Sequence, residues 1–236
     1  MLAPLIRIVP PGGHRNRAGH MPRCARCGMH LRLCLCGELQ PLALATRVVV
    51  ISSERELPQP TNTGRLVPLA LQHGEVHARG RGAPPLPREQ LVDPARRTVL
   101  LFPAAGAREL CREPGDEREL TLIVPDGTWR KARRMALREP GLAGLECASL
   151  PAGPPSRYRL RAHPDERCLA TFEAVARALG ILEGPPVQAH LERVFALFVE
   201  RTLFSRGQLG GELPEGIART GKPRWLDRTA ASEPAP

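Results

Sequence analysis

Four cysteines lie close together near the start of the chain, with the spacing C-x2-C-x6-C-x-C: Cys24, Cys27, Cys34 and Cys36. Four thiolates this close can surround one Zn²⁺ ion tetrahedrally, and a short loop with so little apolar material needs such a staple. Two disulfides or an iron–sulfur cluster are the alternatives. Nothing in the chain indicates an oxidising compartment, and the spacing matches neither common ferredoxin pattern. The cysteines therefore predict a structural zinc knuckle.

A second group able to do chemistry is the segment Asp126-Gly127-Thr128-Trp129, which follows an apolar run. A lone carboxylate there is either a helix N-cap or a group that accepts a proton from a substrate. Trp129 is one of only eight aromatic residues, and it either stacks on a base or packs in the core. Basic residues follow at helical spacing and are candidates for binding RNA phosphates: Arg130, Lys131, Arg133 and Arg134.

The segment 156–161 holds the only tyrosine of the chain, Tyr158, between Arg157 and Arg159. An aromatic side chain among arginines suits RNA, whereas an exposed edge strand protected by charges explains the pattern equally well. We take these three residues as candidate RNA contacts.

The elements that must position these residues alternate between apolar runs and amphipathic segments. Strands are predicted at residues 47–52, 98–102, 120–124 and, from a weaker signal, 145–150. Helices are predicted at residues 63–72, 103–111, 128–138, 169–179 and 191–202, with Gly180 ending the fourth. This alternation predicts an α/β fold with an open parallel sheet and helices on both faces.

Ligands of such sheets bind where strands end and helices begin. Three unusual segments fall at that edge: Thr61-Asn62-Thr63-Gly64-Arg65, Leu101-Phe102-Pro103 and Asp126-Gly127-Thr128-Trp129. The chain has no GxGxxG, Walker or HExxH motif, so its sequence does not support dinucleotide, P-loop or zincin chemistry.

Composition and charge narrow the class of protein. The 236 residues carry a net charge of +10. Residues 1–50 contain seven arginines and one acidic residue, so this segment alone contributes +6. A segment with so much positive charge indicates a polyanionic partner. The longest apolar run is residues 194–199, far short of the ~20 residues that span a bilayer. We therefore expect a cytoplasmic protein with RNA as partner, no membrane contact and no predicted protein partner.

The expected organisation is a disordered basic extension at residues 1–20, the knuckle at 21–40, one catalytic domain at 41–205 and a tail at 206–236. Met21 is a candidate for the true start.

Taken in order, these motifs resemble the DTW-domain family, which is named after its Asp-x-x-Trp core. The resemblance covers about residues 21–205 and includes segments 60–66, 158–161 and 169–174 besides the motifs above. It implies a SPOUT-like fold with a trefoil-type knot. It also implies a tRNA-uridine aminocarboxypropyltransferase, which moves the 3-amino-3-carboxypropyl group of S-adenosylmethionine to N3 of a uridine and releases 5′-methylthioadenosine.

On this resemblance, the S-adenosylmethionine site is bordered by Asn62, Thr63, Gly64, Leu101, Phe102, Pro103, Gly127, Thr128 and Trp129. Asp126 lies between donor and uridine as the candidate catalytic base, and Arg65 joins the candidate RNA contacts. The sequence departs from the family pattern at Ser52, Ser53 and Gln59 ahead of the turn, and at Ala104 and Ala170. An RNA methyltransferase of the same fold and a non-enzymatic zinc-knuckle RNA-binding protein are the competing interpretations.

Overall fold

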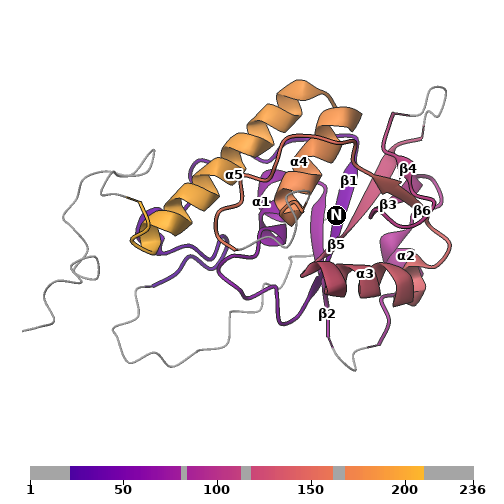
Figure 1. The fold of residues 1–236 in the computed structure, drawn as a ribbon, viewed down its shortest axis with the longest axis horizontal. Helices are drawn as coiled ribbons and strands as arrows, with labels where there is room; N and C mark the ends of the chain where they lie inside the picture. The colour runs from indigo at the N-terminus through magenta and orange to yellow at the C-terminus, as the bar shows by residue number, and fades with distance from the viewer. Residues whose placement is uncertain (1–21, 81–83, 113–117, 162–167, 210–236) are drawn as a thin grey trace, which may run out of the picture.

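The computed structural model describes residues 22–80, 84–112, 118–161 and 168–209 (Figure 1). Within these residues six strands form one sheet in the order β2-β1-β5-β3-β6-β4, and every neighbouring pair is parallel. The strands are β1 (Arg47–Ser53), β2 (Gly74–Arg79), β3 (Arg97–Leu101), β4 (Arg108–Glu109), β5 (Leu120–Asp126) and β6 (Glu146–Ser149). The predicted open parallel sheet is confirmed.

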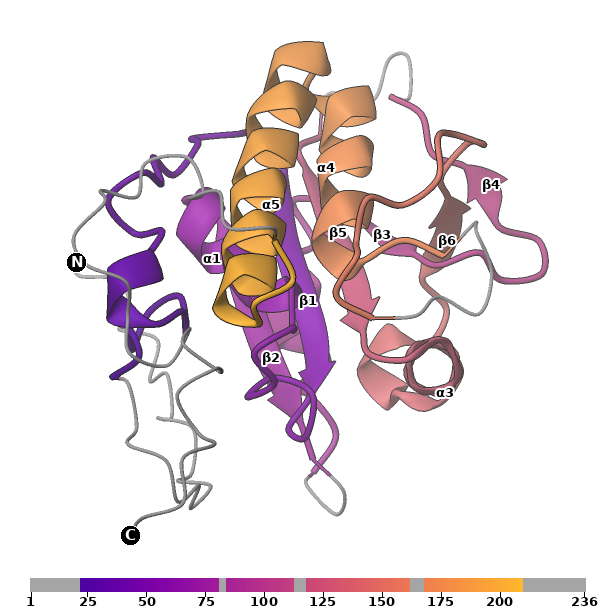
Figure 2. The same ribbon diagram turned by 60° about the vertical axis from the view of Figure 1, so that its left-hand side comes forward.

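Helices cover both faces of the sheet, as predicted (Figures 1 and 2). On one face lie α1 (Val67–Ala70), α4 (Thr171–Leu182) and α5 (Pro185–Ser205), and on the other α2 (Arg88–Leu91) and α3 (Trp129–Arg138). Short 3-10 helices are η1 (Leu31–Leu33), η2 (Gly64–Leu66) and η3 (Pro140–Leu142).

The position of β1 inside the sheet, between β2 and β5, explains why its sequence is one continuous apolar run. Val48 and Val50 belong to the core under α4 and α5, whereas Val49 and Ile51 belong to the core on the α3 side. All four side chains are fully buried. A strand covered on both faces therefore loses the apolar–polar alternation of a half-exposed strand.

The predicted secondary structure differs from the observed one at several places. The helix predicted at 103–111 is absent; this segment is a loop that leads into β4, and Gly106 adopts φ +81. Its small alanines offer no apolar stripe that a helix could bury. Strand β2 was not predicted, because it lies at the sheet edge and only its first residue, Gly74, is buried.

Gly180 was predicted to end the fourth helix, but it lies inside α4. A Cβ at this position would lie 2.1 Å from Oε1 of Gln188 on α5, so glycine permits the close approach of the two helices. The predicted 63–72 helix is realised as the short η2 and α1 in succession.

The extension at residues 1–20 and most of the predicted tail lie outside the described residues. Among the described helices, none is both long and apolar enough to cross a membrane.

Candidate functional site at the carboxyl edge of the sheet

Asp126, the last residue of β5, is the centre of a buried hydrogen-bond cluster. Its side chain is only 4% exposed. Oδ2 accepts hydrogen bonds from Ser52 Oγ at 2.5 Å and from Asn62 Nδ2 at 2.6 Å, and Oδ1 accepts one from the Thr171 hydroxyl. One carboxylate thus joins the end of β1, the turn at residues 61–64 and the first residue of α4.

The turn at 61–64 is held from several sides. The Tyr158 hydroxyl donates to the Thr61 carbonyl at 2.5 Å, and Nε of Arg161 donates to Thr61 Oγ1 at 2.8 Å. A Cβ on Gly64 would lie 3.1 Å from Asp126 Oδ2, so a larger residue would press on the carboxylate. Two predicted donor-binding residues, Asn62 and Thr63, are themselves buried in this cluster.

An aromatic pair lies next to Asp126 at the same edge. Phe102, directly after β3, is buried, and its ring stacks on that of Trp129 with centroids 5.2 Å apart. Trp129 begins α3 and remains 51% exposed. Gly127 connects β5 to α3 at φ +150, a conformation that favours glycine. The pair therefore presents an exposed aromatic surface beside the buried carboxylate.

The other predicted donor-site residues differ in exposure. Leu101 is buried at the end of β3, whereas Pro103 and Thr128 are exposed and Gly127 is half-buried. These residues lie at one edge because β3 and β5 are neighbouring parallel strands.

The basic residues after Trp129 lie on the solvent side of α3. Arg130, Arg133 and Arg134 are exposed, and no ion pair to their side chains occurs within the described residues. The Lys131 ammonium nitrogen, Nζ, lies 3.8 Å from Glu56 Oε2 and forms an ion pair with it. The three arginines are thus available to a phosphate backbone.

The segment around Tyr158 is divided between surface and core. Arg157 and Arg159 are exposed, but the Tyr158 ring is 7% exposed and lies against Phe195. Burial raises the pKa of the Tyr158 hydroxyl. The structure therefore uses this tyrosine to hold the 61–64 turn, and only its arginine neighbours face solvent.

The sequence reasoning missed several residues of this cluster. Ser52 was noted only as a departure from the family pattern, and Thr171 and Arg161 were assigned no role. Glu173 was also missed; its buried carboxylate accepts hydrogen bonds from the backbone N–H groups of Arg157 and Ala170 at 2.7 and 3.0 Å. The sequence signals for these residues were indirect. Ser52 ends a predicted strand, and Arg161, Thr171 and Glu173 fall in segments 158–161 and 169–174 of the family resemblance.

The four predicted metal ligands do converge. Their sulfur atoms all lie within 4.8 Å of one another, and the pairs Cys24–Cys36 and Cys27–Cys34 are each separated by 3.7 Å. A disulfide needs ~2.05 Å, whereas a tetrahedral ion with metal–sulfur bonds of ~2.3 Å places sulfurs about 3.8 Å apart. The arrangement fits one metal ion and not two disulfides.

The thiols differ in how readily they ionise in the absence of a cation. Burial raises the pKa of Cys27 and of Cys36. Burial also acts to raise that of Cys24, but hydrogen bonds from the backbone at Cys27 and Arg26 lower the Cys24 pKa to about 7. A bound cation would favour the thiolate form at all four positions.

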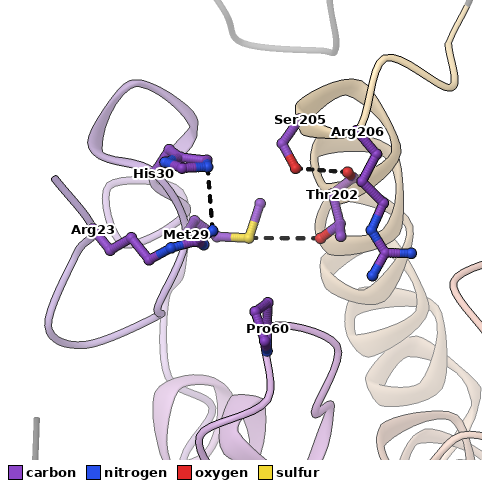
Figure 3. A pocket seen from close by; sticks show the side chains of 7 residues that line it. All are labelled: Arg23, Met29, His30, Pro60, Thr202, Ser205 and Arg206. Atoms are coloured by element: carbon purple, nitrogen blue, oxygen red, sulfur yellow. Dashed lines mark hydrogen bonds between the residues drawn. The ribbon is translucent and has the colours of Figure 1, made fainter. Parts of the chain in front are cut away.

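The cysteine loop packs on the domain through α5. Arg201 is fully buried, donates to the Cys34 carbonyl at 2.8 Å and pairs with Glu38. Figure 3 shows Met29 reaching across to α5, where its sulfur lies 3.7 Å from the Thr202 hydroxyl. The gap left between loop and helix is a cavity of about 170 Å³. Its lining residues are Arg23, Met29, His30, Pro60, Thr202, Ser205 and Arg206.

A buried carboxylate and an exposed tryptophan lie at the carboxyl edge of a parallel sheet, the edge at which open α/β domains commonly bind their ligands. Within this class, the chain belongs to the DTW domain family, whose model matches residues 21–203.

Curated relatives share this region. The chain is 28% identical over 183 residues to a Drosophila melanogaster protein named tRNA-uridine aminocarboxypropyltransferase 2, covering 75% of this chain and 70% of that protein. Proteins of the same name from Macaca fascicularis and Mus musculus are each 30% identical, over 173 and 175 residues. These matches cover 70% and 71% of this chain but only 58% and 59% of those relatives. No solved structure matches the chain.

Replacing one ligand should remove the metal. We expect Cys27→Ser to lower the metal content, measured by elemental analysis, from about one ion per chain to a small fraction, and to lower the free energy of unfolding by more than about 2 kcal/mol. Cys147→Ser, at a half-buried cysteine outside the cluster, is the matched control. Equal metal content in the two variants would contradict a metal site here.

Proposed function

We propose that this protein is a tRNA-uridine aminocarboxypropyltransferase with S-adenosylmethionine as donor. The observation that carries the proposal is the convergence of the Asn62 turn, Phe102 and the Asp126–Trp129 segment at one sheet edge, in a chain of the DTW family. The names of the relatives support the reaction class, and the exposed arginines of α3 support an RNA substrate.

The donor would bind along the carboxyl ends of β3 and β5. The exposed face of Trp129 and the apolar end of β3 suit an adenine ring and a thioether, so the residues present fit this molecule. S-adenosylmethionine supplies a carbon activated by the neighbouring sulfonium. When uridine N3 attacks the γ-carbon, the N3–C bond forms, the C–S bond breaks, and 5′-methylthioadenosine leaves as a neutral thioether without needing a proton.

Uridine N3 keeps its proton up to about pH 9, and protonated N3 is a poor nucleophile. The reaction at neutral pH therefore needs a group that removes this proton. A carboxylate has about four sites that can accept a hydrogen bond. In Asp126, three of these sites are occupied by donors from Ser52, Asn62 and Thr171. One acceptor site is left for a substrate proton. We propose that Asp126 is the base and that Ser52, Asn62 and Thr171 hold it in place.

Transfer to N3 should depend on this carboxylate. We expect Asp126→Asn to bind S-adenosylmethionine within a few-fold of wild type, by calorimetry, but to transfer about 10²–10⁴ times more slowly. Thr171→Val keeps the carboxylate and loses one donor, so its rate should lie between the two. Thermal unfolding of both variants separates loss of chemistry from loss of fold, and near wild-type turnover by Asp126→Asn would remove Asp126 from the base role.

The tRNA backbone would lie across α3, on the side away from α4 and α5. Arg133→Glu should weaken tRNA binding and reduce the slope of log K against log salt by about 1, because one phosphate contact is lost. Arg193→Glu, at an exposed position of α5 on the other face, makes the same charge change as a control. An equal loss of affinity in both variants would argue for a nonspecific charge effect.

The closest competing function is an RNA methyltransferase that uses the same donor. The nucleoside profile of tRNA, from cells with and without the gene and from purified tRNA incubated with the protein, distinguishes the two by mass. We expect a uridine that gains an aminocarboxypropyl group and disappears when the gene is deleted. A methylated nucleoside instead would establish the methyltransferase, and absence of donor binding would favour a non-enzymatic RNA-binding protein.

The remaining elements of the proposal concern fold, metal and location. The insertion of β5 between β1 and β3, which both precede it in the chain, supports a SPOUT-like arrangement. The sulfur spacing supports Zn²⁺ in a structural role at the cysteine loop. A tRNA substrate agrees with a cytoplasmic protein.

A further inference from the structure

Arg65 follows the Asn62-Thr63-Gly64 turn, and its side chain lies against the cysteine loop. A Cβ on Gly28 would lie 2.1 Å from Nη1, 2.5 Å from Cζ and 2.7 Å from Nη2 of Arg65, so the guanidinium covers the open face of that glycine. Gly28 adopts φ +72 directly after the ligand Cys27. Glycine at position 28 therefore serves both the sharp turn and the approach of the arginine.

The Arg65 guanidinium lies against Gly28, the residue that follows the predicted ligand Cys27. Burial lowers the pKa of the Arg65 guanidinium, and a negative charge on Cys27 acts in the opposite direction. Four thiolates around a divalent ion leave a net charge of −2, and a nearby cation stabilises such a charge in a partly buried loop. Arg65 is a half-buried cation placed against this loop.

The backbone of Arg65 belongs to the Asp126 cluster. Its N–H donates to Asn62 Oδ1 at 3.0 Å, and the Asn62 amide donates to Asp126 Oδ2 at 2.6 Å. One residue thus contacts the metal loop with its side chain and the site turn with its backbone.

We infer that Arg65 is a positioning residue that compensates the charge of the metal–thiolate group and, through Asn62, couples the metal loop to the Asp126 cluster. Its role is then not contact with RNA. The inference rests on the metal site proposed above, and it is independent of which group the protein transfers.

The test uses the full-length protein reconstituted with Co²⁺, whose thiolate-to-metal absorption band reports the electron density on the sulfurs. Arg65→Met removes the charge and keeps the length, Arg65→Lys keeps the charge, and Arg26→Met removes an exposed arginine from the same loop as a control. We expect Arg65→Met to bind Co²⁺ about 10 times more weakly, in the range typical of residues that support metal ligands. Its band should move to longer wavelength, because thiolates without a neighbouring cation give up charge more easily.

Arg65→Lys should restore most of the band position, and Arg26→Met should match wild type in both respects. Amide hydrogen exchange should be faster at residues 61–65 in Arg65→Met, and also in wild-type protein from which the metal has been removed. Unchanged Co²⁺ affinity and spectrum in Arg65→Met would overturn the inference, and weaker tRNA binding alongside them would assign Arg65 to RNA instead.

These outcomes are distinct from failure of the proposed function. Cobalt binding and amide exchange need neither tRNA nor the donor. If no aminocarboxypropyl transfer is found, the metal readouts still decide the role of Arg65.

Discussion

A carboxylate that is 4% exposed at the end of the central strand β5 is stable only if hydrogen-bond donors replace the water it has lost. Asp126 obtains three donors, and they come from positions 74, 64 and 45 residues away in the chain. Leaving such a group with unmade hydrogen bonds costs ~1–3 kcal/mol or more. The end of β1, the 61–64 turn and the start of α4 are therefore tied to one point, and the geometry of the site follows from it.

A second layer of contacts supports this point. Tyr158 and Arg161 hold the Thr61 side of the turn, and Glu173 holds the backbone that leads into α4. Tyr158 and Glu173 are buried, whereas Arg161 is partly exposed at the surface of the cluster. Figure 2 shows the helices α4 and α5 that cover this face of the sheet. The segment 156–161, whose composition suits an RNA contact, thus places Tyr158 in the interior and Arg157 and Arg159 at the surface.

The cysteine loop is attached to the domain by charge as well as by packing. A fully buried arginine, Arg201, is tolerated because the Cys34 carbonyl and Glu38 accept its hydrogen bonds. Met29 contacts α5, and Arg65 covers Gly28 from the side of the turn. The cysteine loop therefore lies against α5 and against Arg65, which follows the 61–64 turn. The exposed arginines of α3 lie on the other face of the sheet.

The sequence by itself determined the strands at the centre of the sheet, because burial on both faces leaves a continuous apolar run that is visible locally. It also determined the cysteine cluster and the Asp126–Trp129 turn, whose residue types and short spacing carry their chemistry. Only the tertiary structure decided the donors to Asp126, the inward position of Tyr158, the orientation of Arg65 and the edge strand β2. Each of these features depends on contacts between residues far apart in the chain or on partial burial. Long-range contacts and partial burial leave no periodic pattern in the sequence.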